Sequence, residues 1–131
     1  PAAENVASAP DSAFSMPTAR RDTIRRAAAA VAGGEIGLDV GADPDKARAQ
    51  MLGLRGIGPW TADYVMMRGL GHPDTFLTND LGVRHGLDRL GITNGDEAQW
   101  ASWRSYAVHH LWASLSQPSV HPASPRKQTD E

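Results

Sequence analysis

The sequence predicts an all-α fold. Apolar residues recur at helical spacing in successive segments, and glycine, proline and helix-capping residues stand between those segments. No segment alternates between apolar and polar residues as a half-buried strand would, and no internal repeat is visible.

The first helix is expected to begin near Pro17 and to end at Gly33, because proline fits a first helical turn and glycine suits a helix end. Its predicted buried stripe consists of Ile24, Ala27, Ala28 and Val31. The opposite face is predicted to be solvated and carries Arg20, Arg21, Arg25 and Arg26.

Two helices joined by a tight turn are expected next. Asp43 can cap the first of them, which begins at Pro44 and continues to Met51. Residues 55–59 hold too much glycine for a continuous helix and are too short for a pair of strands, so they predict a hairpin between helices. Pro59 begins the second helix, whose buried stripe is predicted to be Ala62, Val65, Met66 and Gly69.

A fourth helix follows a loop rich in glycine and proline. Thr78 or Asn79 is expected to cap this helix, which begins near Asp80 and ends before Gly91. Its predicted buried residues are Val83, Leu87 and Leu90.

A final helix is predicted over residues 102–116. Its buried side is expected to consist of Trp103, Ala107, His110, Leu111 and Leu115. His110 is therefore interpreted as a core residue, and His109 points to another face. Because neither a His-Glu-x-x-His motif nor a Cys/His spacing occurs, no metal site made of side chains is expected.

Composition limits the class of protein. The chain has 131 residues, which is room for one compact domain or for part of a larger one. It contains no cysteine, which excludes a disulfide framework, a thiolate zinc site and a cysteine nucleophile. The formal net charge of −2 argues against a protein that coats nucleic acid non-specifically, since such affinity comes from Lys and Arg. Its apolar stretches are far shorter than the ~20 residues of a membrane span, so no membrane partner is expected.

Three segments are expected along the chain. Residues 1–13 are small, polar and aperiodic, and are expected to be a disordered linker. Residues 14–116 hold the predicted helices and form the domain. Residues 117–131 are rich in proline and are expected to be a disordered tail. Because the sequence begins with Pro1, we expect it to be a piece of a longer chain.

The hairpin Gly56-Ile57-Gly58 is the first candidate site. Its glycines let the backbone turn sharply while Ile57 anchors the turn, which leaves amides of the following helical turn free to bind an anion. Such a hairpin can hold a DNA phosphate, and Thr61 can add a hydroxyl. The alternative is a plain structural turn. Nucleotide-binding loops are excluded, because the third glycine of a dinucleotide fingerprint and the Gly-Lys-Ser/Thr of a P-loop are both missing.

Asp80 is the second candidate. It stands at the end of the glycine- and proline-bearing loop and at the start of a predicted helix. An aspartate at that position commonly caps the helix, and this is the alternative to a chemical role. The hairpin and the aspartate together, in this order, form a more specific pattern than either alone.

The run LRGIGPWTADYVMMRGLGHPDTFLTNDLGVRHGL resembles the helix–hairpin–helix, Gly/Pro-rich loop and aspartate signature of the DNA glycosylase superfamily, and most of all its 3-methyladenine DNA glycosylase II branch. The supporting matches are Gly-Ile-Gly-x-Trp-Thr-Ala at 56–62 with Tyr64, Phe-Leu-x-x-Asp at 76–80, and Trp-Arg-Ser-Tyr-Ala at 103–107 followed by Leu111 and Trp112. The resemblance extends from Phe14 to Leu115. It departs from the family at Ser102, which stands where the family has a proline.

The resemblance implies a monofunctional glycosylase that hydrolyses the N-glycosidic bond of alkylated purines such as 3-methyladenine and leaves an abasic site. Asp80 would be the catalytic carboxylate, which stabilises the cationic sugar or orients the attacking water. Trp60 stands where bifunctional relatives carry a lysine nucleophile, so lyase activity is not expected. Trp60, Tyr64 and Trp112 match the aromatic residues of the base pocket, where stacking favours a positively charged methylated purine.

The resemblance also implies partners. Gly56, Gly58 and Thr61 would contact double-stranded DNA that contains alkylated bases. No cofactor is expected apart from a structural monovalent cation, which would map to the backbone carbonyls of Leu52, Leu54 and Ile57. The protein is expected to be a monomer in the bacterial cytoplasm, associated with the nucleoid while it acts.

Family members also have an N-terminal β-domain and earlier helices, which complete the cleft and supply a residue that wedges into the duplex. We therefore expect residues 1–131 to be the C-terminal portion of a glycosylase domain. Activity is expected of the longer protein, whereas this piece lacks groups that offset the free-energy cost of base flipping.

Two further hypotheses remain. In the first, the hairpin only tethers DNA and Asp80 only caps a helix, so that the chain is a non-catalytic helix–hairpin–helix DNA-binding module. In the second, the chain is a helical protein-interaction domain without salt-dependent affinity for DNA.

Overall fold

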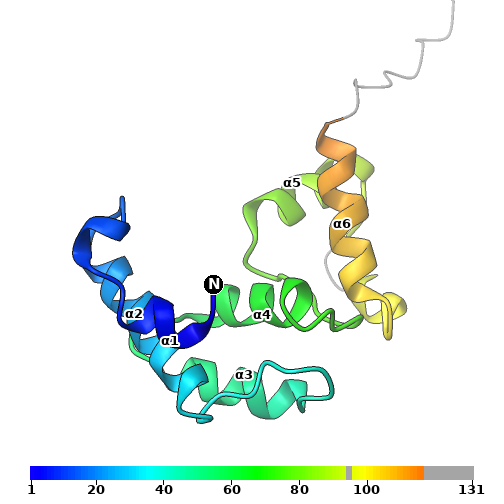
Figure 1. Cartoon of the computed structure of the whole chain (residues 1–131). Helices are drawn as coiled ribbons and strands as arrows, with labels where there is room; N and C mark the ends of the chain where they lie inside the picture. Colours follow the sequence, from blue (N-terminus) through cyan, green and yellow to red (C-terminus); the bar gives the residue numbers. More distant parts are fainter. Residues whose placement is uncertain (94–95, 117–131) are drawn as a thin grey trace, which may run out of the picture.

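The computed structural model describes residues 1–93 and 96–116, and over these residues the chain is helical, without a strand. The all-α prediction is confirmed. The elements in chain order (Figure 1) are α1 (Ala3–Ala7), the 3-10 helix η1 (Asp11–Ala13), α2 (Thr18–Ala32), α3 (Pro44–Leu52), α4 (Pro59–Arg68), α5 (Leu81–Leu90), the 3-10 helix η2 (Asp96–Trp100) and α6 (Arg104–Leu115). The expected tail at 117–131 lies outside the described residues. No described helix is long and apolar enough to cross a membrane.

Local sequence sets most of the helix ends. Asp43 caps α3 by accepting hydrogen bonds from the backbone N–H of Asp45 at 3.0 Å and of Lys46 at 3.1 Å, and Pro44 occupies the first helical turn. Gly91 ends α5 with a left-handed backbone at φ 66°. These ends agree with the sequence-based expectations.

The cap of α5 differs from the prediction. Asp80 itself, and not Thr78 or Asn79, is the N-cap residue, and its Oδ1 accepts from the Val83 N–H at 2.8 Å. Asp80 is the cap because its carboxylate reaches the third amide of the helix, which would otherwise lack a hydrogen-bond partner.

The expectation of a disordered linker over residues 1–13 is wrong. α1 packs on α2, and Asp11 of η1 forms ion pairs with Arg21 at 2.9 Å and Arg25 at 2.7 Å. Arg25 also donates to the Ala9 carbonyl, and its guanidinium lies 5.1 Å from the centre of the Phe14 ring. The arginine face of α2 is therefore not simply solvated, because part of it holds a segment too short to be helical by itself.

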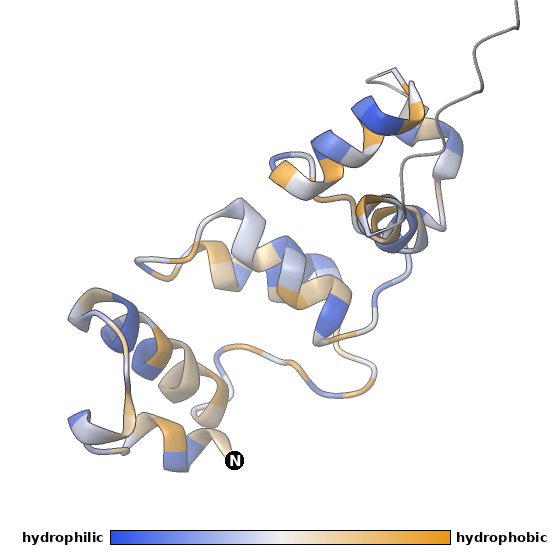
Figure 2. Cartoon of the chain, turned by 90° about the horizontal axis from the view of Figure 1, so that it is seen from above, coloured by the Kyte–Doolittle hydropathy of each residue, from blue (hydrophilic) through white to orange (hydrophobic). Residues whose placement is uncertain are grey.

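Two groups of buried side chains form the core, and α4 lies between them (Figure 1). The first group joins α2, α3 and α4 and consists of Ala30, Ile36, Ala47, Met51, Ala62 and Met66. The second joins α4 to α5 and α6 and consists of Met67, Leu77, Val83, Leu87, Val108 and Leu111. An ion pair of 2.5 Å between Arg48 and Asp63 also ties α3 to α4. Figure 2 shows orange and blue residues alternating along the helices, as expected where each helix buries one face.

The buried face of α6 also differs from the prediction. The residues that face the core are Ser105, Val108, Leu111 and Ser114. Trp103 is the N-cap and is 61% exposed, and His110 is exposed rather than part of the core. Small residues are needed on this face because α5 approaches closely: a Cβ added at Gly86 would lie 2.8 Å from the Leu111 carbonyl oxygen.

Candidate active site

The hairpin between α3 and α4 has the geometry that its glycines predict. Gly56 has φ +98°, which glycine adopts without strain, and a Cβ at this position would collide with Thr23 of α2. Ile57 packs against the first core group, and Arg26 of α2 donates a hydrogen bond to the Arg55 carbonyl. The hairpin is therefore supported from behind by α2.

The N-terminus of α4 is open to an anion. Gly58 is its N-cap residue and has no side chain that could accept hydrogen bonds from the first N–H groups of the helix. Thr61 lies in the exposed first turn. Backbone N–H groups of a first helical turn bear partial positive charge, so this end can accept a phosphate oxygen.

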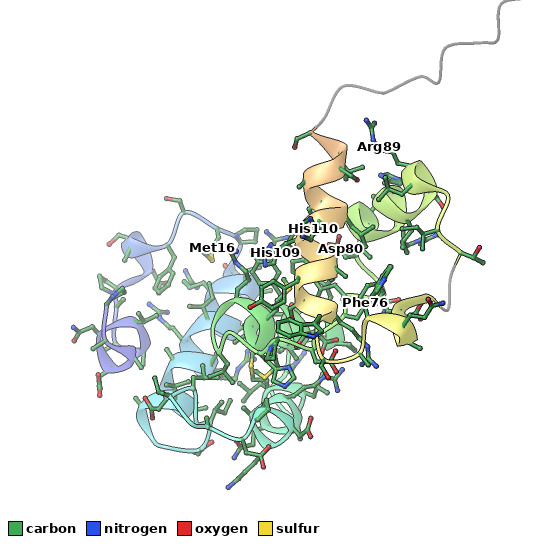
Figure 3. All side chains as sticks on the ribbon, turned by 90° about the vertical axis from the view of Figure 1, so that its right-hand side faces the viewer. Met16, Phe76, Asp80, Arg89, His109 and His110 are labelled. Carbon is green, nitrogen blue, oxygen red and sulfur yellow. The ribbon has the colours of Figure 1, made fainter. Side chains whose placement is uncertain are left out.

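The Asp80 carboxylate is held by donors from three directions. Its Oδ1 accepts from the Val83 backbone N–H at 2.8 Å and from the Trp112 indole Nε1 at 2.8 Å. Its Oδ2 accepts from the Trp60 indole Nε1 at 2.9 Å. The carboxylate thus stands between α4, α5 and α6. In Figure 3 Asp80 lies beside α6, the helix that carries His109 and His110.

These donors stabilise the ionised form of Asp80. Partial burial by itself raises the pKa of this carboxyl, but it is outweighed by hydrogen bonds from Trp112, the Val83 N–H, Trp60 and the Gly82 N–H. The net effect is a pKa below the usual value for aspartate, because each donor stabilises the ionised form. The carboxylate is consequently charged at neutral pH.

Three aromatic side chains form a continuous group beside the carboxylate. Trp60 and Tyr64 are stacked with ring centres 5.1 Å apart and an interplanar angle of 23°. Tyr64 is tilted by 40° against Trp112 at 6.3 Å. Trp60 is 42% exposed, so part of this aromatic group is accessible to solvent. The predicted site residues Trp60, Tyr64, Trp112 and Asp80 are thereby brought together.

Two neighbours of this site were not predicted from the sequence. The His109 ring meets Trp112 edge-on, with ring centres 5.5 Å apart at 86°. Gly82 leaves room for the same indole, since a Cβ there would lie 3.0 Å from Trp112 and 3.1 Å from Asp80. For His109 the sequence did hold a signal, because residues three apart on a helix, such as His109 and Trp112, are neighbours on its surface. Gly82 offers no comparable signal, because its contact is with a distant helix.

The carbonyl oxygens predicted to hold a monovalent cation lie at the end of α3, in the turn that leads into the hairpin, and in the hairpin itself. The Leu54 carbonyl accepts from the Ile57 N–H at 3.1 Å, which closes the turn and leaves one lone pair on that oxygen. Neutral carbonyl oxygens are a ligand type that suits an alkali cation. The site stays a prediction.

The chain is similar in sequence to known proteins. No protein-family model matches the chain. The chain is 41% identical over 124 residues to a Mycobacterium tuberculosis protein named probable bifunctional transcriptional activator/DNA repair enzyme AlkA, covering 90% of this chain and 25% of that protein. It is 32% identical over 103 residues to Escherichia coli DNA-3-methyladenine glycosylase 2, covering 76% of this chain and 36% of that protein. It is 37% identical over 78 residues to a Bacillus subtilis DNA-3-methyladenine glycosylase, covering 53% and 26%. The chain thus spans between a quarter and about a third of the length of these relatives.

Proposed function

This chain belongs to the helix–hairpin–helix DNA glycosylases, in the 3-methyladenine DNA glycosylase II branch, and from that premise we propose that it carries the reaction centre of a monofunctional DNA glycosylase. The reaction is hydrolysis of the N-glycosidic bond of an alkylated purine, such as 3-methyladenine, to leave an abasic site. The observation that carries the proposal is the ionised Asp80 carboxylate, held beside an open group of aromatic rings.

Asp80 acts on the sugar. When a cationic alkylated base departs, positive charge develops on the sugar ring, and a nearby carboxylate stabilises it by Coulomb attraction. The same carboxylate can orient the attacking water. The hydrogen bonds from Trp60 and Trp112 stabilise the ionised form of Asp80 and fix it in place, so little reorganisation is needed when the transition state forms.

The aromatic group binds the base. A methylated purine is electron-poor and positively charged, and the faces of Trp60 and Tyr64 are electron-rich. Stacking of the flipped base on these rings therefore favours alkylated over ordinary purines and offsets part of the cost of leaving the duplex.

Trp60 also supports a reaction without an amine-dependent lyase step. A lyase of this class needs an amine that attacks the sugar and forms a Schiff base, and an indole nitrogen is not a nucleophilic amine. We expect an intact abasic site as the product and no covalent complex on treatment with borohydride.

The hairpin supplies the contact to DNA. Gly56 and Gly58 shape the turn, and the open amides at the start of α4, with the Thr61 hydroxyl, bind one phosphate of the duplex. The proposed partner is double-stranded DNA with alkylated bases, in the bacterial cytoplasm, with the protein acting as a monomer.

The test is release of methylated bases. A chimera is made in which this chain replaces the matching quarter of the Mycobacterium tuberculosis relative, and 3-methyladenine and 7-methylguanine released from methylated duplex DNA are measured. Asp80→Asn is compared with Asp88→Asn, which changes an exposed aspartate at the other end of α5. Release by the chimera and by Asp88→Asn, but not by Asp80→Asn, is the expected result. The same assay on residues 1–131 alone tells whether this part suffices.

A non-catalytic DNA-binding module is the second candidate, and the cap contact from Asp80 to Val83 is the observation that favours it. In that case neither the chimera nor this chain releases a base, while salt-dependent binding to duplex DNA persists in the Asp80→Asn variant.

A further inference from the structure

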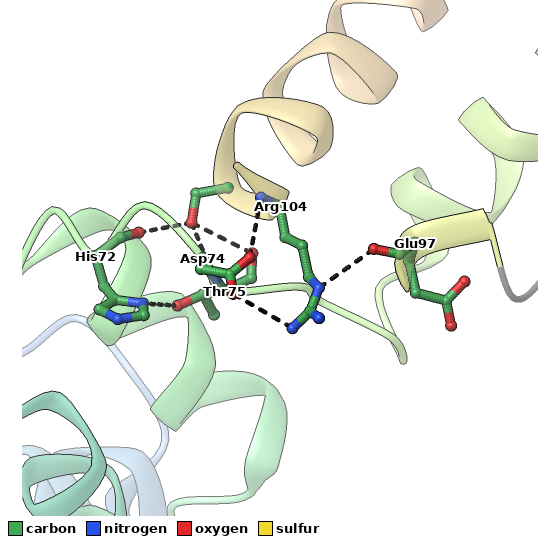
Figure 4. Close-up of polar contacts among 6 residues, drawn as sticks. His72, Asp74, Thr75, Glu97 and Arg104 are labelled. Atoms are coloured by element: carbon green, nitrogen blue, oxygen red, sulfur yellow. Dashed lines mark hydrogen bonds and ion pairs between the residues drawn. The ribbon is translucent and has the colours of Figure 1, made fainter. Parts of the chain in front are cut away.

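The segment Trp-Arg-Ser-Tyr-Ala at 103–107 has no part in the proposed chemistry, yet two of its residues make most of the polar contacts between α6 and the rest of the molecule (Figure 4). These two residues are Arg104 and Ser105, in the first turn of α6. Both contact the loop that follows α4.

Ser105 is the centre of this network. It is 6% exposed, its hydroxyl donates to the His72 carbonyl at 2.6 Å and accepts from the Thr75 N–H at 3.0 Å, and its own N–H donates to the Pro73 carbonyl at 2.9 Å. One serine therefore satisfies three backbone groups of a loop rich in glycine and proline. These bonds help to hold the loop in one conformation and offset the conformational entropy that it loses on folding.

Arg104 adds a second attachment to the same loop. Its backbone N–H lies 3.4 Å from Asp74 Oδ1, and its guanidinium lies 3.5 Å from Asp74 Oδ2. The guanidinium also donates to the Glu97 carbonyl at 3.2 Å, which ties η2 into the network. The loop is thus bound to α6 from two adjacent residues.

The position of this network in the fold gives it consequences at the active site. The loop joins α4, which carries Trp60, to α5, which Asp80 caps. α5 packs on α6 with Gly86 against the Leu111 carbonyl, so Asp80 and Trp112 belong to one packed unit. Trp60 belongs to α4. Its bond to Asp80 is the hydrogen bond described above between α4 and this unit, beside the apolar contacts of the second core group and of Tyr64 with Trp112.

We propose that Ser105, assisted by Arg104, is a positioning residue for the glycosylase reaction: it fixes the loop at 72–75 on α6 and thereby places Asp80 within reach of Trp60. Ser105 touches neither the carboxylate nor an indole in any contact described above, so it acts through the backbone of the loop. The role of Ser105 in catalysis rests on the proposed function. Its effect on the hydrogen bond between Trp60 and Asp80 can be measured whether or not the protein releases bases.

The two indole N–H groups report on that geometry separately. The chain has four tryptophans, and single Trp60→Phe and Trp112→Phe variants assign the two indole resonances in ¹⁵N-labelled protein. In Ser105→Ala the Trp60 indole resonance is expected to move upfield, and its exchange with solvent should become about tenfold faster, as for loss of a bond to a charged acceptor. The Trp112 resonance should stay in place, because its bond lies within the α5–α6 unit.

Ser114→Ala is the matched control. Ser114 is also a buried serine of α6, but its hydroxyl donates to the Leu111 carbonyl of the same helix at 2.6 Å. Ser114→Ala removes no contact with the loop, so both indole resonances are expected to stay unchanged. Ser105→Thr keeps the hydroxyl and should restore the Trp60 resonance.

Arg104→Met keeps the test decisive if Ser105→Ala does not fold. It retains the apolar stem of the side chain and removes the guanidinium bound to Asp74 and Glu97. A smaller shift of the Trp60 resonance in the same direction is expected. An unchanged Trp60 resonance in folded Ser105→Ala, or in Arg104→Met when the first variant is unfolded, overturns the positioning role.

Base release separates this inference from the proposed function. In the chimera, Ser105→Ala should lower kcat for release by about tenfold with little change in KM for DNA, since the hairpin and its phosphate site are untouched. No release by the unsubstituted chimera would overturn the proposed function alone, and the resonance comparison would still decide the positioning role.

Discussion

Trp60 donates its indole N–H to the carboxylate of Asp80 at 2.9 Å, although the two residues belong to different helices. The contact joins the start of α4, which follows the hairpin, to the cap of α5. Because the same carboxylate also receives the Trp112 indole at 2.8 Å, one side chain connects three helices. The proposed phosphate contact and the proposed reaction centre are thereby held in a fixed relation.

Trp60→Phe should separate the two roles of this tryptophan. Phenylalanine keeps a ring to stack on Tyr64 but loses the donor to Asp80, so base release should fall at least roughly tenfold, for a hydrogen bond to a charged acceptor worth about 1.5 kcal/mol. Trp60→Ala removes the stacked ring as well, so base release should fall further in that variant. Single-turnover release from methylated duplex DNA measures both. Equal rates in wild type and Trp60→Phe would show that the hydrogen bond is dispensable.

Asp80 has a capping role and a catalytic role, and two substitutions distinguish them. Asparagine can still cap α5, whereas alanine leaves the Val83 N–H without its partner and should lower the free energy of unfolding by about 0.5–2 kcal/mol. Both variants should lose base release. Urea unfolding compared with the release assay checks this, and a rate that tracks stability across the two variants would contradict it.

The lowered pKa of Asp80 predicts an acid-sensitive component of stability. A carboxyl whose pKa is lower in the folded than in the unfolded chain stabilises the fold above its unfolded pKa of about 3.9, and this stabilisation is lost as the pH falls through the folded pKa. The difference in unfolding free energy between wild type and Asp80→Asn should therefore shrink below about pH 4.

Asp11 does not disturb that comparison. The hydrogen bond from Arg25, opposed by burial and aided by the charges of Arg21 and Arg25, also lowers the pKa of Asp11. Since Asp11 is present in both proteins, its contribution cancels in the difference.

A difference in unfolding free energy between wild type and Asp80→Asn that stays constant from pH 6 to pH 3 would show that Asp80 is not stabilised in its ionised form.

Gly56→Ala should destabilise the hairpin for two reasons that can be separated. Its φ of +98° strains any residue with a Cβ, and that Cβ would meet Thr23. A loss of roughly 1–3 kcal/mol is expected. Adding Thr23→Ala should recover the steric part and leave the backbone part, measured by thermal unfolding of the two single variants and the double variant. Additive effects would show that the two residues do not interact.

Much of the local structure could be predicted from the sequence. Asp43-Pro44 and Pro59 mark the starts of α3 and α4, and Gly91 marks the end of α5, because caps and turns depend on residues only a few positions apart. Two sequence-based predictions were wrong: which face of α6 is buried, and disorder over the residues that form α1. Both depend on a partner elsewhere in the chain: Gly86 admits the serine-bearing face of α6, and the arginines of α2 hold the first segment.

The sequence by itself determined the all-α class, the hairpin and the residue types of the candidate site, because each has a short-range signature or a family motif. Only the tertiary structure decided how Asp80 is held. Its two indole donors come from a helix before it and a helix after it. The Ser105 hydroxyl binds backbone atoms of the loop between α4 and α5, and backbone atoms leave no pattern in the sequence. Contacts between distant segments depend on how the helices pack, and packing is a property of the folded chain as a whole.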